Sequence, residues 1–158
     1  MPTDRGFFIK AVGDQVYTGG LIKPVALVYD KDGLLVEKRD YTVTYKRNKN
    51  VNDASKATTA PTIVINGKGN YSGTQSALFK IVPKNIADSD IQIDDLKAAY
   101  NGRAQKLTPV VYRDGKTLKK TTDFIVSYPK TEVGSYLNSG THPIVIDGVK
   151  NYTGTRTA

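Results

Sequence analysis

The chain carries one ordered set of short motifs twice, and this internal repeat constrains its fold more than any other feature. In both halves, a Tyr-x-Gly motif is followed by Asp-Gly, by an alternating aromatic and aliphatic run, and by a closing Asn-Tyr-Ser/Thr-Gly-Thr motif. The spacing between matched motifs stays at about 81 to 83 residues, which indicates two diverged copies of one module. The matched segments are 17–19 with 100–102, 25–29 with 108–112, 32–33 with 114–115, 40–45 with 123–128, 63–67 with 144–148, and 70–74 with 151–155.

Within each copy, apolar residues recur at every second position, which is the period of a β-strand. Tyr41, Val43 and Tyr45 share one face of an expected strand, and residues 124–128 repeat this layout with Phe124 in place of Tyr41. Because the hydroxyl is lost between the copies while the ring is kept, we expect this ring to lie in the core. The strands expected in the first copy are 7–12, 15–18, 22–30, 34–38, 41–46, 60–66 and 75–82.

Turn residues separate these runs. Asp32-Gly33 and Asp114-Gly115 each stand between apolar segments, and Asp-Gly supplies the positive φ that tight hairpins need. Val25, Leu27 and Tyr29 are expected to form a further apolar face just before the first of these turns. About seven short strands in fewer than about 80 residues predict an all-β module with two sheets packed as a sandwich.

The repeat divides the chain into a first module at 1–83, a linker at 84–89 and a second module at 90–158. The linker is short and follows a proline, so we expect limited hinge motion. The final expected strand of the first copy, within 76–82, has no counterpart after Thr155, so the second module is expected to lack its last strand. Either the sequence is cut inside this module, or the module is closed by something else. The edge left beside it is expected to pair with another chain or to fray.

Composition narrows the classes of partner. The formal charge of +8 and pI near 9.5 would suit contact with anionic polymers, but a lysine-rich solvated surface explains them better. The nearest basic cluster, Lys46, Arg47 and Lys49, is not interleaved with aromatics, so nucleic acid is not an expected partner. The chain has no cysteine for disulfides or thiolate metal sites, and no apolar run approaches the roughly 20 residues of a membrane span.

The order of motifs resembles the tandem bacterial immunoglobulin-like repeats of the MBG type. The residues that carry the resemblance are the Tyr-x-Gly and Asp-Gly sites, residues 40–45 and the run 67–74, and it extends over nearly all of both copies. The second copy departs from the pattern at Phe124 and at 148–150. The resemblance implies two immunoglobulin-like modules of a secreted, multi-domain protein at the surface or cell wall of a Gram-positive bacterium. It also implies spacer or adhesion duty beside neighbouring repeats, and it carries no catalytic residues to transfer.

Hydrolytic chemistry finds little support in the residues. His142 is the only histidine, stands beside Pro143 and has no counterpart in the first copy, so we interpret it as a loop residue. The run 30–33 has the start of a calcium loop, but the distant glutamate is missing and Arg113 replaces Asp30 in the second copy. The sequence therefore predicts no enzyme activity, no cofactor and no metal site.

Two modification patterns have simpler interpretations. Lys23, Asp40 and Asn70 have counterparts in the second copy and contain the residue types of a Lys–Asn isopeptide bond, although an exposed lysine and two turn residues explain them better. Asn-x-Ser/Thr patterns at 70–72 and 151–153 are interpreted as turns rather than as glycosylation sites.

The long loops are the places where the copies differ most, so any ligand specificity is expected there. Tyr136 lies in the loop between Tyr128 and Ile144 and has no counterpart, while the matching loop of the first copy holds Lys46, Arg47 and Lys49. These four residues are the candidate ligand-binding residues. The expected function is a non-catalytic stalk, spacer or adhesion segment of a bacterial surface protein. The alternatives are a repeat that binds a host or cell-wall glycan, mucus or a matrix protein, and an accessory module of a secreted carbohydrate-active enzyme.

Overall fold

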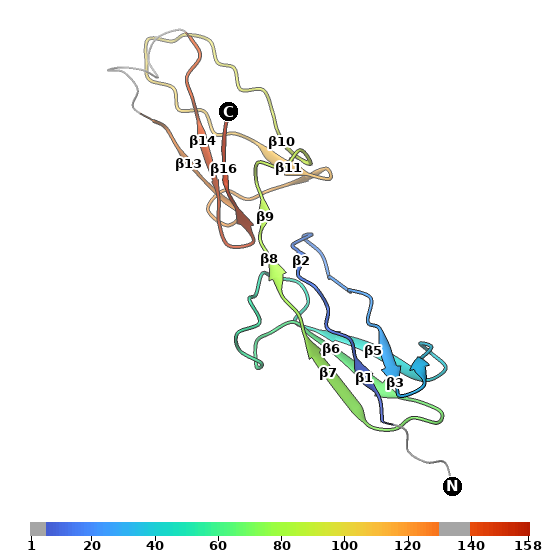
Figure 1. Ribbon diagram of the computed structural model, residues 1–158. Helices are drawn as coiled ribbons and strands as arrows, with labels where there is room; N and C mark the ends of the chain where they lie inside the picture. Colours follow the sequence, from blue (N-terminus) through green and yellow to red (C-terminus); the bar gives the residue numbers. More distant parts are fainter. Residues whose placement is uncertain (1–5, 130–139) are drawn as a thin grey trace. The chain divides into compact units, whose positions relative to one another are not determined.

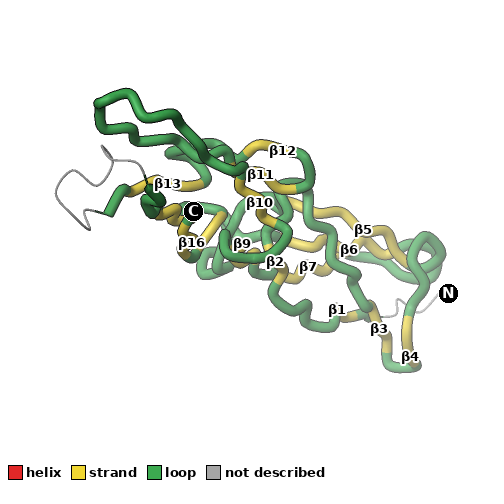
Figure 2. Tube along the Cα trace, turned by 90° about the horizontal axis from the view of Figure 1, so that it is seen from above, coloured by secondary structure: helices red, strands yellow, loops and turns green. Residues whose placement is uncertain are grey.

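The computed structural model describes residues 6–129 and 140–158, and every regular element among them is a β-strand (Figures 1 and 2). The strands form several small sheets rather than one continuous one. The chain divides into two compact units, Met1–Val82 and Pro83–Ala158. Within the described residues, no helix is long and apolar enough to cross a membrane.

The described residues of the first unit contain eight short strands, arranged in two three-stranded sheets and one parallel pair. Their order in the sheets is β1-β3-β4 and β5-β6-β7, and β2 pairs with β8. The strands are β1 (Phe8–Ile9), β2 (Gln15–Val16), β3 (Val28–Asp30), β4 (Gly33–Leu34), β5 (Tyr41–Lys46), β6 (Thr62–Gly67), β7 (Thr74–Leu78) and β8 (Ile81–Val82).

The antiparallel ladder of β5, β6 and β7 is the largest sheet of this unit. Val43 pairs with Ile65, and Ile65 in turn pairs with Gln75 of the outer strand. Alternation places Tyr41 in the core and leaves Thr42 exposed, as the period of two predicted. Ile65 is fully buried in the centre of this ladder. The prediction for residues 41–46 is therefore confirmed.

The second unit contains a similar set of small sheets. β10, β11 and β12 form one, β13, β14 and β16 form another, and β9 pairs with β15 in a parallel ladder. The strands are β9 (Lys84–Asn85), β10 (Ile91–Ile93), β11 (Val111–Arg113), β12 (Lys116–Thr117), β13 (Phe124–Ser127), β14 (Val145–Gly148), β15 (Tyr152–Thr153) and β16 (Thr155–Thr157).

Equivalent positions of the two units make the same hydrogen bonds. The Val36 N–H donates to the Asp40 carboxylate at 2.8 Å, and the Lys119 N–H donates to the Asp123 carboxylate at the same distance. The hydroxyl of Tyr45 donates to the Pro24 carbonyl at 2.8 Å, while that of Tyr128 donates to the Leu107 carbonyl at 2.8 Å. Side chains that the two copies share therefore hold turns and strands in place.

The expected strand at 22–30 is wrong over most of its length, because only Val28–Asp30 pairs in a sheet. The expected apolar face is also reversed. Val25 is 82% exposed, whereas the alternate residues Ile22, Ala26 and Val28 are buried. The segment is extended with one buried face, but most of it lacks a strand partner, so alternation of burial does not by itself produce a ladder.

The Asp-Gly turns of the two units differ, contrary to their alignment in the sequence. In the second unit, Asp114 and Gly115 both have positive φ (50° and 73°) and form the two-residue loop that joins β11 to β12. In the first unit only Gly33 has positive φ, and it pairs with Asp30 in the ladder. Here the Asp30 carboxylate accepts the N–H groups of Asp32 and Gly33 and closes the turn.

The stretch expected to be a linker, 84–89, belongs to the second unit instead. The Lys84 N–H donates to the Asn151 carbonyl at 3.0 Å, and the Ile86 N–H donates to the Thr153 carbonyl at 2.8 Å. Ile86 is fully buried. Its burial and these bonds explain why the stretch is ordered within the unit, although its polar composition resembles that of a linker.

Candidate functional site

Among the predicted ligand-binding residues, Arg47 acts in the structure as a brace for its own loop. Its guanidinium donates to the Ala60 carbonyl at 2.9 Å and to the Thr62 hydroxyl at 3.2 Å. These bonds join the two ends of the loop that connects β5 to β6. Lys46 and Lys49 are exposed on either side of it. Lys46 is the last residue of β5, whereas Arg47 and Lys49 lie in the loop that follows it. Arg47 braces that loop, and the two lysines are exposed.

This loop is also fixed to the body of the first unit. Asn48 is buried, and its side-chain amide donates to the Ile22 carbonyl at 2.8 Å while its own carbonyl accepts the Ile22 N–H. Asn52 exchanges two backbone hydrogen bonds with Ile81 at 2.9 and 3.0 Å. Tyr136, the remaining candidate residue, lies outside the described residues, and its role stays a prediction.

The calcium-like run has its carboxylate occupied by protein donors. One Asp30 oxygen accepts two backbone N–H groups of the turn, and the other accepts the Tyr71 hydroxyl at 2.6 Å. Across residues 6–129 and 140–158, no group of three or more His, Asp or Glu side chains is placed to hold a metal ion.

The carboxylate of Asp40, which was considered for an isopeptide bond, is likewise engaged. It accepts the N–H of Val36 and two N–H groups of Arg39 at 2.8 to 2.9 Å. The hydrogen bond from Arg39 is the main reason that the pKa of Asp40 lies below its usual value. Lys23 is exposed, as is Asn70. The carboxylate therefore serves the turn before β5.

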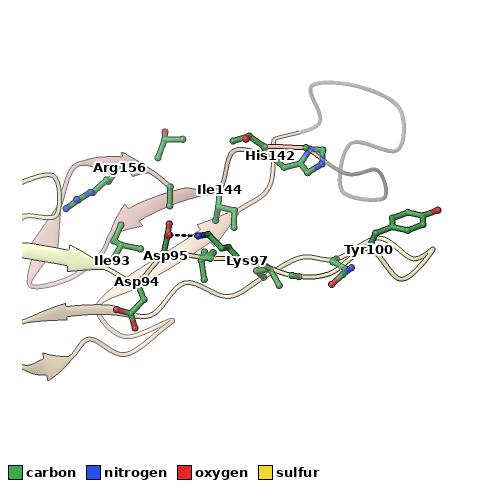
Figure 3. Close-up of a pocket in the computed structure, with 16 residues that line it drawn as sticks. Ile93, Asp94, Asp95, Lys97, Tyr100, His142, Ile144 and Arg156 are labelled. Atoms are coloured by element: carbon green, nitrogen blue, oxygen red, sulfur yellow. Dashed lines mark ion pairs between the residues drawn. The ribbon is translucent and has the colours of Figure 1, made fainter.

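A concave surface lies in the second unit (Figure 3). This pocket has a volume of about 660 Å³ and lies between the segment that follows β10 and the segments around β14 and β16. Figure 3 shows Ile93, Asp95 and Lys97 on the first side, with Ile144 and His142 on the other. Its residues are Ile93 to Ala98, Tyr100, Gln105, Leu107, Gly140 to His142, Ile144 and Arg156 to Ala158.

The polar groups around this pocket are of both signs. Asp95 and Lys97 form an ion pair at 3.2 Å, but both side chains are more than four-fifths exposed, so the pair contributes little to stability. Arg156 donates to the Ile91 carbonyl at 2.5 Å. Asp94 stands at the start of the segment after β10, and its hydrogen bond with Tyr112 of β11 raises the pKa of that tyrosine. No single charge dominates the rim, so general attraction of one kind of ion does not explain the pocket.

The corresponding place in the first unit is filled. There β8 lies along β2, and Ile81 and Phe79 are 1% and 2% exposed. Tyr17, just after β2, is 8% exposed, whereas its counterpart Tyr100 is 67% exposed. Among the described residues of the second unit, no strand pairs with the segment around Tyr100.

Sequence reasoning expected an unpaired edge in the second module, but it did not place that edge near Tyr100 and did not identify a pocket. The expected strand 75–82 is in fact two strands, β7 and β8, and β16 is the counterpart of β7. The depth of the pocket depends on how far the segment after β10 stands from β14, and no local pattern encodes that separation. Searches with models of protein families, against curated proteins and against solved structures found no match to this chain.

Proposed function

We propose that the two units are diverged copies of an immunoglobulin-like β-sandwich module and serve as a non-catalytic spacer in a bacterial surface protein. The resemblance of the motifs supports this. The hydrogen bonds within the units support it too, because Asp40 makes the same bond as Asp123, and Tyr45 the same bond as Tyr128. Residues kept in both halves serve the fold, and the residues that differ most lie in loops. That distribution is typical of a module with a structural role.

One observation carries the proposal: in each unit a short parallel ladder joins an early segment to a late one. In the first unit it is β2 with β8, and in the second it is β9 with β15. In each ladder one strand lies at an end of its unit, and the other lies one strand further in, after β1 or before β16. When such a unit is pulled along the chain, the two parallel strands slide along each other. Their hydrogen bonds must then break together instead of one after another. A spacer under tension at a cell surface benefits from this arrangement.

The bonds of the first ladder are well defined. The Gln15 N–H donates to the Lys80 carbonyl and the Tyr17 N–H donates to the Val82 carbonyl, both at 2.9 Å. Since N–H groups alternate in direction along a strand, that of Val16 points away from β8. Of the neighbouring residues Gln15 and Val16, only Gln15 therefore donates a hydrogen bond in this ladder.

The test is single-molecule force spectroscopy on the full chain held between marker domains. Gln15→Pro removes one donor of the ladder and is expected to lower the unfolding force of one of the two units. Val16→Pro is the matched control, because it introduces the same ring at a position whose N–H makes no bond with β8. Equal unfolding forces for wild type and both variants would contradict a mechanical role for the ladder.

An adhesive function is the second candidate, and the exposed Lys46 at the end of β5 and Lys49 on the braced loop after it favour it. It predicts saturable binding to a glycan, mucus or matrix protein that persists at physiological salt. Exposed charges are screened beyond about 8 Å under those conditions, so binding lost there would indicate only general charge attraction. An accessory module of a secreted carbohydrate-active enzyme would instead bind the substrate of its catalytic neighbour.

A further inference from the structure

We propose that the first unit binds a carboxylated glycan on the outer face of the sheet formed by β1, β3 and β4. The glycan lies on the stacked rings of Phe8 and Tyr29, and one of its carboxylates pairs with Lys10. We call this surface, made by Phe8, Lys10, Leu27, Tyr29 and Leu34, the aromatic face. The inference goes beyond spacer duty and does not depend on it, and it concerns a different surface from the basic loop after β5.

The register of the ladders places three of these side chains in one row across the sheet. Phe8 pairs with Tyr29, and Tyr29 pairs with Leu34, so all three point to the same side. Figure 2 shows β1, β3 and β4 next to one another. The rings of Phe8 and Tyr29 are stacked, with centroids 5.8 Å apart and planes 18° apart. Phe8 is 56% exposed and Leu34 is 57% exposed, so the row is an apolar surface open to water.

The other side of the same sheet supplies the core, so the fold does not require an apolar outer face. Phe7, Val28 and Leu35 alternate with the residues of the aromatic face, and all three are buried. A sheet with one buried face ordinarily shows polar residues on the other. Apolar residues that gather on one exposed face mark a binding surface.

The matching face of the second unit is polar, although its ladders have the same register. Gln92 pairs with Tyr112, and Tyr112 pairs with Thr117. Gln92 and Thr117 therefore stand where the first unit has Phe8 and Leu34, while the central tyrosine is kept. The same fold thus forms without the apolar row, so the row serves something other than folding.

Charge on this face differs between the units in the same way. The Lys10 N–H donates to the Leu27 carbonyl at 2.9 Å, and the Asp94 N–H donates to the Val110 carbonyl at 3.1 Å, so a lysine corresponds to an aspartate. Among the described residues, no carboxylate forms an ion pair with Lys10. A single ammonium beside an apolar surface suits the isolated carboxylates of an acidic sugar, whereas a densely sulfated chain would need a cluster of basic residues.

A depression of about 290 Å³ continues the aromatic face on the side away from the Asp-Gly turn. Lys10, Val25 and Leu27 line it, and among the described residues that line it Lys10 has the only charge. Between Val25 and Tyr29 the extended chain covers about 13 Å. The face and the depression together therefore accommodate a short stretch of glycan instead of a single sugar.

A glycan fits this surface better than a protein or a small apolar ligand does. Stable protein interfaces need about 20–30 residues on each side, far more than the aromatic face has, and two copies would also bring net charges of +8 together. An extended peptide gains affinity from backbone hydrogen bonds at a sheet edge, which a sheet face does not offer. A small apolar ligand needs a cavity that buries about 70–90% of its surface. A sugar ring, in contrast, has one C–H face for aromatic rings and keeps its hydroxyls in water.

The probes are short oligomers of three carboxylated glycans: polygalacturonic acid, hyaluronan and polysialic acid. Each is titrated into the full 158-residue chain at physiological salt, where exposed charges are screened beyond about 8 Å, and binding is followed by amide NMR shifts. We expect saturable binding of at least one of them, with shifts at 8–10 and 27–34 and none at 92–94 and 110–117. The polar face of the second unit is thus a control within the same sample.

A pair of variants tests the rings. Phe8→Gln places the residue of the second unit on the aromatic face, and it should weaken binding about five- to tenfold because the stacking surface is lost. Leu21→Gln makes the same kind of change at a residue that is 65% exposed and lies outside the face. It should leave binding within about twofold, because a singly exposed apolar residue needs no ligand to explain it.

Methyl esterification of the glycan tests the carboxylate, because it removes the charges and keeps the rings. The ester should bind about two- to fivefold more weakly than the acid, the range for one exposed ion pair. Lys10→Gln should weaken binding of the acid by the same factor and leave binding of the ester unchanged, since both changes remove one interaction. Lys49→Gln, on the loop after β5, should change the affinity for the acid by less than about twofold.

Several results overturn the inference. These are no saturable binding to any of the three glycans, equal affinity of wild type and Phe8→Gln, equal weakening of acid and ester by Lys10→Gln, and shifts centred on 46–49, which would indicate the basic loop. Shifts at the aromatic face that appear without glycan as the protein concentration rises would indicate a second copy instead. The same shifts with phosphatidylglycerol vesicles, and none with the glycans, would indicate a lipid surface. The force measurement on β2 and β8 is independent of all these results, so the two proposals can fail separately.

Discussion

Two glycines at equivalent places in the units predict a large and specific loss of stability on substitution by alanine. Gly67 ends β6 and Gly148 ends β14, and each lies against the turn that follows its strand. A Cβ at Gly67 would lie 2.8 Å from the backbone N of Ser72, and one at Gly148 would lie 2.6 Å from the N of Thr153. Contacts of this length do not occur between a methyl group and backbone atoms, so the strand or the turn must move.

The size of the effect follows from what has to move. Because the clashing atoms are backbone, no side-chain rotation relieves the contact, and the cost is near the upper part of the range for overpacking, about 2–3 kcal/mol. The turn is also tied back by the Gly67 N–H, which donates to the Gly73 carbonyl, as the Gly148 N–H does to Gly154. For a unit of this size, that cost lowers Tm by roughly 8–24 °C.

The assay is thermal unfolding by circular dichroism, with hydrogen exchange to locate the loss. Gly67→Ala should weaken protection in β5 to β7, and Gly148→Ala should weaken it in β13, β14 and β16. Gly13→Ala is the control, because nothing lies within 4 Å of the added methyl group, and it should stay within about 0.5 kcal/mol of wild type. Tm values for the two test variants within about 2 °C of this control would refute the steric argument.

Two further predictions concern polar contacts. Tyr71→Phe removes a buried hydrogen bond to the Asp30 carboxylate and should cost about 1.5–3 kcal/mol in urea unfolding, and a change below about 0.5 kcal/mol would contradict this role. Acid should weaken the second unit, because a hydrogen bond from Lys84 lowers the pKa of Asp90 in the folded state. That stabilisation is present above the unfolded pKa of about 3.9 and is lost as pH falls through the folded value. Asp90→Asn should make the fall of Tm between pH 5 and about pH 2 less steep. An unchanged slope of Tm against pH would exclude this contribution.

Strands that pair with neighbours nearby in the sequence could be predicted from alternation alone. Residues 41–46 and the expected strand at 60–66 correspond closely to Tyr41–Lys46 and Thr62–Gly67, where β-branched and aromatic residues alternate along an antiparallel ladder. The segment before Val28 could not be predicted in this way. Pro24 has no N–H to give to a ladder, and burial there comes from packing against a loop instead of from a sheet.

The candidate site shows the same limit. Arg47 was selected for its charge, but its neighbours in space are the carbonyl of Ala60 and the hydroxyl of Thr62, which no local pattern reveals. The pocket of Figure 3 lies beside the segment near residue 98, whose counterpart near residue 15 has a strand beside it in the first unit. In the first unit that strand is at 81–82, far along the chain, so the contact is visible only in the structure.

The pairing of β2 with β8 also sets the order of events in folding. Closing a loop between residues 15 and 81 carries a large entropic cost and brings few contacts until it is complete, so this ladder should form late. A ribosome adds about 5 to 20 residues per second, so an emerging first unit has its β2 edge uncovered until its eighth strand appears. During that interval the edge of β2 is uncovered, as the matching segment near residue 98 is in the second unit. Strands from neighbouring nascent chains can then pair with it. Mispairing during synthesis is thus expected to concentrate at this edge, before any mature surface is formed.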